Sequence, residues 1–178
     1  KTGPIKDYLF VSVSELSAFN SIFRSYDNGE SWELMNYSDD WYRVYTFVSN
    51  SDGIIFIGLG DTAPHSNNGL IFKSINFGFD WISLISTSNI TELVLDNNEF
   101  IYAGTASGWT GGCQGIIRTT NGGGIWESFN SGLAPGSCGF VLGCNSGGIL
   151  FAATETGIYR TIESTTAINE NEEVIPSE

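Results

Sequence analysis

Short apolar runs recur along the whole chain, separated by polar clusters rich in glycine, serine, asparagine and aspartate. Runs of this length and spacing indicate β-strands joined by tight turns. The strands expected from this pattern are Tyr8–Val13, Ser21–Arg24, Trp32–Asn36, Tyr42–Ser49, Ile54–Leu59, Leu70–Ser74, Ile90–Leu95, Phe100–Thr105, Gly115–Thr119, Trp126–Phe129, Phe140–Gly143, Ile149–Thr154 and Ile158–Thr161. The chain is therefore expected to be all-β.

One octet recurs at the same place in each group of strands. It begins at Ser25, Ser74 and Thr119, and a degenerate fourth copy begins at Thr161. Each clear copy carries a hydroxyl, then an Asx residue, a glycine and a tryptophan at fixed offsets. The members are Ser25, Asp27, Gly29 and Trp32; Ser74, Asn76, Gly78 and Trp81; Thr119, Asn121, Gly123 and Trp126. Copies roughly 45 residues apart indicate a stacked or radial array of one supersecondary unit.

Each position of the octet has a physical role. The hydroxyl and Asx side chains accept hydrogen bonds from nearby backbone N–H groups and close a turn. The glycine supplies positive φ, and the tryptophan places a large ring between neighbouring sheets. The pattern resembles the Asp box, Ser-x-Asp-x-Gly-x-Thr-Trp, of β-propellers such as sialidases, sortilin-type receptors, xyloglucan-cleaving hydrolases and a photosystem II assembly factor. The resemblance implies a propeller fold and does not select one activity.

The strand order predicts about four antiparallel units of four strands, the first without its opening strand and the last without its closing strand. We assign residues 1–162 to β-propeller blades and residues 163–178 to an acidic linker or tail. Three arrangements complete the ring: the chain is part of a longer propeller, it pairs with a second copy, or it closes alone.

The composition and the C-terminal segment limit the classes of binding partner and the cellular location that we expect. A net charge of −13 argues against nucleic acid, because no basic face is available to neutralise phosphates. No apolar run reaches the length of a membrane span. The tail ends in Ile175, Pro176 and Ser177, and it resembles the connector before the sorting domain of type IX-secreted bacterial proteins. An ordinary acidic tail is the alternative. A secreted or cell-surface bacterial protein is the expected location.

The connections place candidate residues on two opposite faces. The octets share one face, and in sialidase-like propellers that face lies away from the active site. The loops 14–20, 60–68 and 106–112 share the other face. Asp61, His65 and Trp109 lie in these loops and are the candidate ligand-binding residues. Each also has a plain alternative: Asp61 as a turn former, His65 as a solvated side chain, Trp109 as a ring packed over the central channel.

Catalytic signatures are weak. His65 is the only histidine, so no histidine-rich zinc site is expected, and we predict no metal or other cofactor. Arg24, Arg118 and Arg160 occupy one equivalent position in the repeat, unlike the convergent arginines of sialidases. The sequence does not exclude a glycosidase whose two catalytic carboxylates come from loops far apart in the chain.

The three cysteines are Cys113, Cys138 and Cys144. Cys138 and Cys144 bracket one strand and are too far apart to bridge. Cys113 and Cys138 fall on the same face, which predicts a disulfide in an oxidising compartment, with reduced thiols as the alternative. The sequence thus favours a non-catalytic module that binds a protein or glycan. The alternative is an extracellular glycoside hydrolase, sialidase- or xyloglucanase-like, or part of one.

Overall fold

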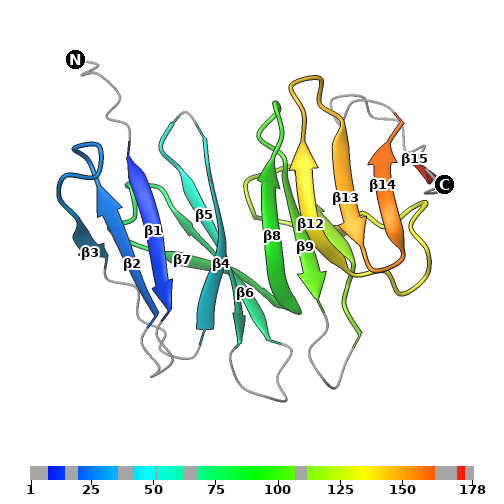
Figure 1. The fold of residues 1–178 in the computed structure, drawn as a ribbon, viewed down its shortest axis with the longest axis horizontal. Helices are drawn as coiled ribbons and strands as arrows, with labels where there is room; N and C mark the ends of the chain where they lie inside the picture. Colours follow the sequence, from blue (N-terminus) through cyan, green and yellow to red (C-terminus); the bar gives the residue numbers. More distant parts are fainter. Residues whose placement is uncertain are drawn as a thin grey trace.

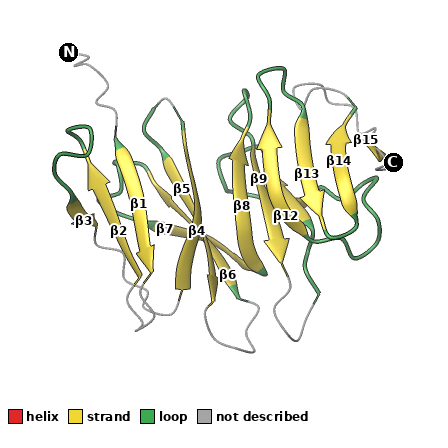
Figure 2. Ribbon diagram, in the orientation of Figure 1, coloured by secondary structure: helices red, strands yellow, loops and turns green. Residues whose placement is uncertain are grey.

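The structure of the chain is a computed structural model, which describes residues 8–14, 20–35, 42–50, 52–61, 68–106, 112–162 and 172–174. Within these ranges all regular structure is β-strand (Figure 2). The strands are β1 (Leu9–Ser14), β2 (Asn20–Ser25), β3 (Glu33–Met35), β4 (Tyr42–Ser49), β5 (Ile55–Asp61), β6 (Gly69–Ser74), β7 (Ile82–Thr87), β8 (Asn89–Leu95), β9 (Ile101–Ala106), β10 (Ile116–Thr119), β11 (Glu127–Ser128), β12 (Gly139–Cys144), β13 (Leu150–Thr154), β14 (Gly157–Thr161) and β15 (Glu172–Val174).

The strands form four antiparallel sheets, each a meander of consecutive strands. Blade 1 is β1–β3, blade 2 is β4–β7, blade 3 is β8–β11 and blade 4 is β12–β15. The blades stand side by side in sequence order, as Figure 1 shows from blue to orange. The predicted all-β propeller of four-stranded units is confirmed, and blade 1 lacks a fourth strand among the described residues, as expected.

The hydrophobic core lies between the blades. Three isoleucines lie three residues before the clear octets and are 0–2% exposed: Ile22 of β2, Ile71 of β6 and Ile116 of β10. Each packs against the next blade, Ile22 for example against Ile55, Ile57 and Leu59 of β5. Because side chains alternate along a strand, every other residue of β5 points back towards blade 1. Equivalent clusters join blade 2 to blade 3 and blade 3 to blade 4.

A β-bulge interrupts the first strand of blades 2, 3 and 4. The register shifts between Val44 and Thr46, between Ile90 and Glu92, and between Gly139 and Val141. These shifts fall at the same position of the three units. A bulge inserts one extra residue and increases the local twist, so the alternation of side chains along this first strand, the inner strand of the blade, breaks at this point.

Blade 4 differs from the sequence expectation. It was predicted to lack its closing strand, but β15 pairs with β14 through Tyr159 opposite Val174 and Thr161 opposite Glu172. This strand comes from within the stretch 163–178 assigned to a tail, and its polar composition gave no strand signal. Residues 163–171 and 175–178, including Ile175, Pro176 and Ser177, lie outside the described residues.

Candidate functional site

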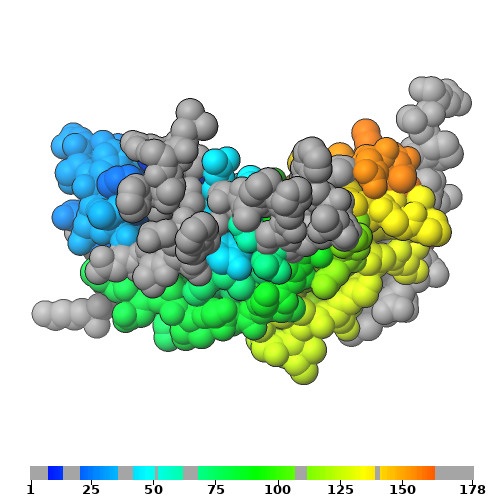
Figure 3. Space-filling model, turned by 90° about the horizontal axis from the view of Figure 1, so that it is seen from below, coloured from blue at the N-terminus to red at the C-terminus, as the bar shows by residue number. Residues whose placement is uncertain are grey.

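The meander topology gives the array two opposite faces. The octets join the third and fourth strands of each blade, and the turns between its first two strands lie at the same end. We call this end the box face. The other end, the loop face, carries the connections between the second and third strands and between blades. Figure 3 looks onto the loop face, where the blades follow a curved path from blue through green to orange.

In the first octet, side chains close the turn on their own backbone. The Ser25 hydroxyl accepts the N–H of Gly29 at 2.8 Å and donates to Asp27 Oδ1 at 2.8 Å. Asp27 Oδ1 also accepts the N–H of Ser31 at 2.9 Å, and Oδ2 accepts the Ser31 hydroxyl. These hydrogen bonds, chiefly from the side chain and backbone of Ser31 and then from Ser25, lower the pKa of Asp27 to about 2.

The second octet uses the same geometry with an amide in place of the carboxylate. Ser74 Oγ accepts the Gly78 N–H at 2.7 Å, and Asn76 Oδ1 accepts the Asp80 N–H at 2.9 Å. The Asn76 Nδ2 group donates to Asp80 Oδ2 at 2.8 Å. The backbone needs only one acceptor oxygen at this position, so asparagine serves as well as aspartate.

The third octet repeats the turn, and the fourth departs from it. Thr119 Oγ1 accepts the Gly123 N–H at 3.1 Å, and Asn121 Oδ1 accepts the Ile125 N–H at 2.9 Å. In the fourth, Thr161 Oγ1 accepts instead the N–H of Leu150 at 3.2 Å. The hydroxyl and Asx groups described in the clear copies are thus hydrogen-bonded within their own turns.

The octet tryptophans pack towards the preceding blade. Trp81 lies against the core between blades 1 and 2, and Trp126 against the core between blades 2 and 3. Trp32 occupies the same position in blade 1, the first blade that the structure describes, and it is 43% exposed. The expected packing between sheets therefore applies to the second and third tryptophans but not to the first.

A second type of turn closed by an Asx side chain lies on the box face and was not predicted from the sequence. Asn50, Asp96 and Asn145 follow the first strand of blades 2, 3 and 4. In each, Oδ1 accepts the backbone N–H groups two and four residues ahead at 2.8–3.1 Å. An Asx residue followed four positions later by an apolar residue that opens a strand is the signal that could have identified these turns.

Of the candidate ligand-binding residues, Asp61 is the one that lies within the described residues, at the loop-face end of β5. Asp61 ends β5, and its N–H is hydrogen-bonded to Asn68 O at 2.9 Å and to Asn89 Oδ1 at 3.0 Å. Asp61 is partly buried. His65 and Trp109 lie outside the described residues, so the structure does not bring the three together.

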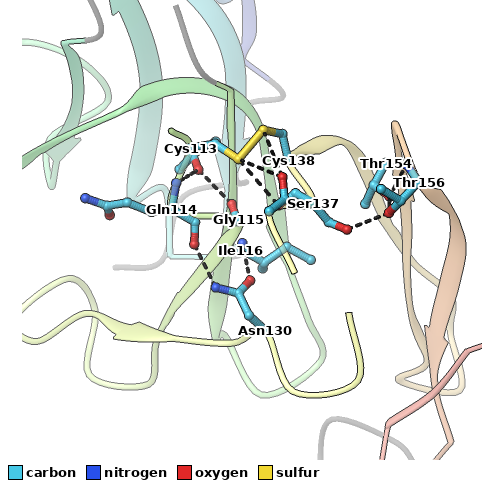
Figure 4. The surroundings of a disulfide bond; sticks show 11 residues. Cys113, Gln114, Gly115, Ile116, Asn130, Ser137, Cys138, Thr154 and Thr156 are labelled. Carbon is cyan, nitrogen blue, oxygen red and sulfur yellow. Dashed lines mark hydrogen bonds between the residues drawn. A yellow bond between two sulfur atoms is a disulfide. The ribbon is translucent and has the colours of Figure 1, made fainter. Parts of the chain in front are cut away.

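A disulfide braces the loop face between blades 3 and 4. Cys113, after β9, is bonded to Cys138, which precedes β12, with their Cα atoms 5.6 Å apart (Figure 4). These are the two cysteines that the sequence pairs, and Cys144 is free. Next to the bridge, Ser137 Oγ and Thr156 Oγ1 are hydrogen-bonded, which links the connection to the β13–β14 turn. The bridge and this hydrogen bond therefore join Cys113, the connection before β12 and the β13–β14 turn.

A small depression lies beside this bridge. It has a volume of about 140 Å³ and is lined by Cys113, Gln114, Asn130 and residues 133–137. Asn130 shapes its floor, because Oδ1 accepts the Ile116 N–H at 2.7 Å and Nδ2 donates to Gln114 O at 2.7 Å. The depression thus combines backbone held by side-chain hydrogen bonds with a lining of both polar and apolar residues.

Metal and membrane features are absent from the described ranges. No group of three or more histidine, cysteine, aspartate or glutamate side chains is placed to hold a metal ion there. Nor do these residues contain a helix of the length and hydrophobicity needed to cross a membrane.

Comparison of structures finds similar proteins, whereas the sequence comparisons do not. No protein-family profile matches the chain, and no curated protein matches its sequence. An ancestral GH74 enzyme is 18% identical, with a TM-score of 0.66 over 96% of this chain and 24% of its own. PorZ, a surface component of the type IX secretion system of Porphyromonas gingivalis, is 14% identical, with a TM-score of 0.64 over 92% of this chain and 25% of its own.

YCF48, in a structure with a D1 peptide, is 16% identical, with a TM-score of 0.54 over 80% of this chain and 44% of its own. The chain therefore spans about a quarter of the first two proteins and less than half of the third. At these identities the likeness concerns the fold alone. The arrangement of blades is that of a β-propeller or part of one.

Proposed function

We propose that the chain is a non-catalytic propeller module that binds a protein or glycan through its loop face. The observation that carries this proposal is the braced rim formed by the Cys113–Cys138 disulfide beside the depression at Gln114 and Asn130. A site whose loops are fixed before binding loses less conformational entropy when a ligand arrives. Asp61, His65 and Trp109 are proposed to extend this surface along the same face.

The box face is less suited to recognition. Its clear octets use their hydroxyl and Asx groups to satisfy backbone N–H groups, as Ser74 and Asn76 do. A ligand that bound these groups would have to replace hydrogen bonds that hold the turn. This contrast favours the loop face.

An extracellular or surface location fits the same features. Structural disulfides persist in oxidising compartments, and two of the similar structures are a GH74 enzyme and a bacterial surface component. The proposal retains a type IX-secreted origin, which rests on the resemblance of the segment around Ile175, Pro176 and Ser177.

A binding experiment with matched variants tests the proposal. The oxidised chain is applied to a glycan array that includes xyloglucan oligosaccharides and to an array of short peptides. Glu155→Arg, on the exposed β13–β14 turn of the loop face, is compared with Glu30→Arg, exposed on the box face. Both variants change the net charge equally, and Gln114→Arg probes the depression.

We expect the two loop-face variants to weaken binding by about tenfold or more, as the loss of an interface contact does. Glu30→Arg should bind as the unaltered chain does. Loss of binding in Glu30→Arg alone would place the site on the box face and contradict the proposal.

The competing function is an extracellular glycoside hydrolase, which the fold likeness to an ancestral GH74 enzyme favours. Release of reducing ends from xyloglucan by the purified chain would support it. Turnover that disappears when a single loop-face carboxylate, for example Asp61→Asn, is replaced would establish it over the binding module.

A further inference from the structure

The outer faces of blades 1 and 4 carry apolar side chains at positions that are buried between the other blades. In blades 2 and 3, the second strand turns an alternating row towards the preceding blade: Ile55, Ile57 and Leu59, then Ile101, Ala103 and Thr105. All six are at most 1% exposed. The pairing of β1 with β2 places Leu9, Val11 and Val13 in the same register in blade 1. These three are 41–44% exposed.

Blade 4, at the other end of the array, carries the apolar side chains that face a following blade. The isoleucine three residues before each clear octet packs on the following blade, as Ile22, Ile71 and Ile116 do. Ile158 holds the same position in blade 4 and is 59% exposed. Phe56 and Tyr102 are 3% and 0% exposed, and their counterpart in blade 4, Phe151, is 38% exposed. The outer face of blade 4 thus keeps the apolar side chains of a blade interface.

A cation also crosses each of the first two blade interfaces. Arg24, just before the first octet, donates from Nη1 to Phe77 O at 2.6 Å in the second octet. Lys73, just before the second octet, donates from Nζ to Gly122 O at 3.1 Å in the third. Phe77 and Gly122 are both the fourth residue of their octet, with φ of 58° and 69°. In blades 1 and 2 the basic side chain before the octet therefore bonds the same backbone carbonyl of the next blade. Arg118 of blade 3 instead donates to Glu127 of its own blade.

The basic donor of this hydrogen bond has a counterpart in blade 4, and the carbonyl acceptor has a counterpart in blade 1. Arg160 is the basic residue of blade 4. Asn28 is the fourth residue of the first octet, is exposed and has a φ of 60°, so its carbonyl is presented as those of Phe77 and Gly122 are. A single chain thus carries donor and apolar side chains at one end and the matching acceptor and apolar row at the other.

We propose that a second copy of this chain occupies these faces, with blade 4 of each copy packed on blade 1 of the other. Two contacts of this head-to-tail kind close a ring of two copies. The described blades curve along an arc in Figure 3, and two chains of four blades give eight, within the range of known propellers. Arg160 then donates to Asn28 O of the partner copy. The inference does not depend on the ligand of the loop face.

The test is the mass of the chain in solution, measured by light scattering and by sedimentation over a range of concentrations. We expect twice the chain mass of 19.3 kDa. Val11→Glu and Ile158→Glu, one at each end, should each give a monomer, because either places a charge in both interfaces of the ring. Ile125→Glu, at a residue 70% exposed in the third octet, is the control and should stay dimeric. Circular dichroism verifies that each variant is folded.

The hydrogen bond has its own test. Arg160→Met should raise the dissociation constant about tenfold or more, because a hydrogen bond from a charged donor is lost. Arg160→Lys should largely restore it, since Lys73 fills this position in blade 2.

Four outcomes would overturn the proposal. A monomer at all concentrations would assign the end faces to blades other than those of a second copy. A mass above that of a dimer would show an open array that does not close. A dimer disrupted by only one of the two glutamate variants would show that one end pairs with itself. Equal effects of Arg160→Met and Arg160→Lys would remove the proposed hydrogen bond.

Discussion

Replacing Thr119 by valine tests whether the octet hydroxyls hold the blades together. Thr119 is 1% exposed, and valine has nearly its shape, so the change removes a hydroxyl with little change in volume. Its Oγ1 accepts the Gly123 N–H at 3.1 Å and donates to Asn121 Oδ1 at 2.9 Å. In Thr119→Val the buried Gly123 N–H loses this acceptor.

The magnitude follows from these two contacts. An unsatisfied buried donor costs about 1–3 kcal/mol, and the lost hydrogen bond adds about 0.5–1.5 kcal/mol. We therefore expect Thr119→Val to lower the free energy of unfolding by about 2–4 kcal/mol. The control, Thr119→Ser, keeps the hydroxyl and removes one methyl group, for a loss of about 1 kcal/mol.

The assay is urea-induced unfolding followed by tryptophan fluorescence, with all variants at one protein concentration because association would stabilise the folded state. Thermal melts should show a fall of about 2–4 °C for each kcal/mol in a chain of this size. If Thr119→Val is no less stable than Thr119→Ser, the octet hydroxyl does not stabilise the turn, and the structural interpretation of the octets is wrong.

Three further predictions concern charge, covalent bonding and backbone conformation. Because Asp27 has a pKa of about 2, below its usual 3.8, its stabilising contribution is present above pH 3.8 and is lost as the pH falls through about 2. The Asp27→Asn variant should lack this part of the acid dependence, which is measured as the urea midpoint of unfolding at each pH. Reduction of the Cys113–Cys138 bridge, 25 residues apart, should lower the free energy of unfolding by about 3 kcal/mol on a chain-entropy estimate, seen in melts with and without reductant, and unchanged melts would contradict this. Gly53→Ala and Gly136→Ala both place alanine at a φ near 80°. Only at Gly53 does the new Cβ overlap a neighbouring side chain, the ring of Phe77. Gly53→Ala should therefore be less stable than Gly136→Ala by about 1–3 kcal/mol, and equal melting temperatures would refute the packing argument.

The sequence predicted the fold because the octet records a complete local interaction. The hydroxyl of Ser25 and the oxygen of Asp27 act on backbone N–H groups two to four residues away, so their spacing in the chain is also their spacing in space. The four antiparallel units follow from that repeat. By the same reasoning, the turns at Asn50 and Asp96 were open to prediction, but no tryptophan marks them.

Features that depend on distant parts of the chain were less accessible. Trp32 follows the octet pattern, but its exposure depends on what packs beside blade 1, which no local pattern records. The strand β15 is held by pairing with β14 rather than by its own polar residues. The loop-face candidates lay where the repeat gives no guidance, since these loops differ from unit to unit in length and composition.

The bulge in the inner strand of each full unit has a consequence for how the protein can change in length. Tyr45, Thr91 and Phe140 are the residues between the paired positions on either side of each register shift. Elsewhere in a strand, deleting one residue turns all later side chains to the wrong side of the sheet. At these three positions a deletion would instead restore regular pairing, so they are the points in the inner strands where natural variants or engineered versions can gain or lose a residue and still keep both surfaces of the blade.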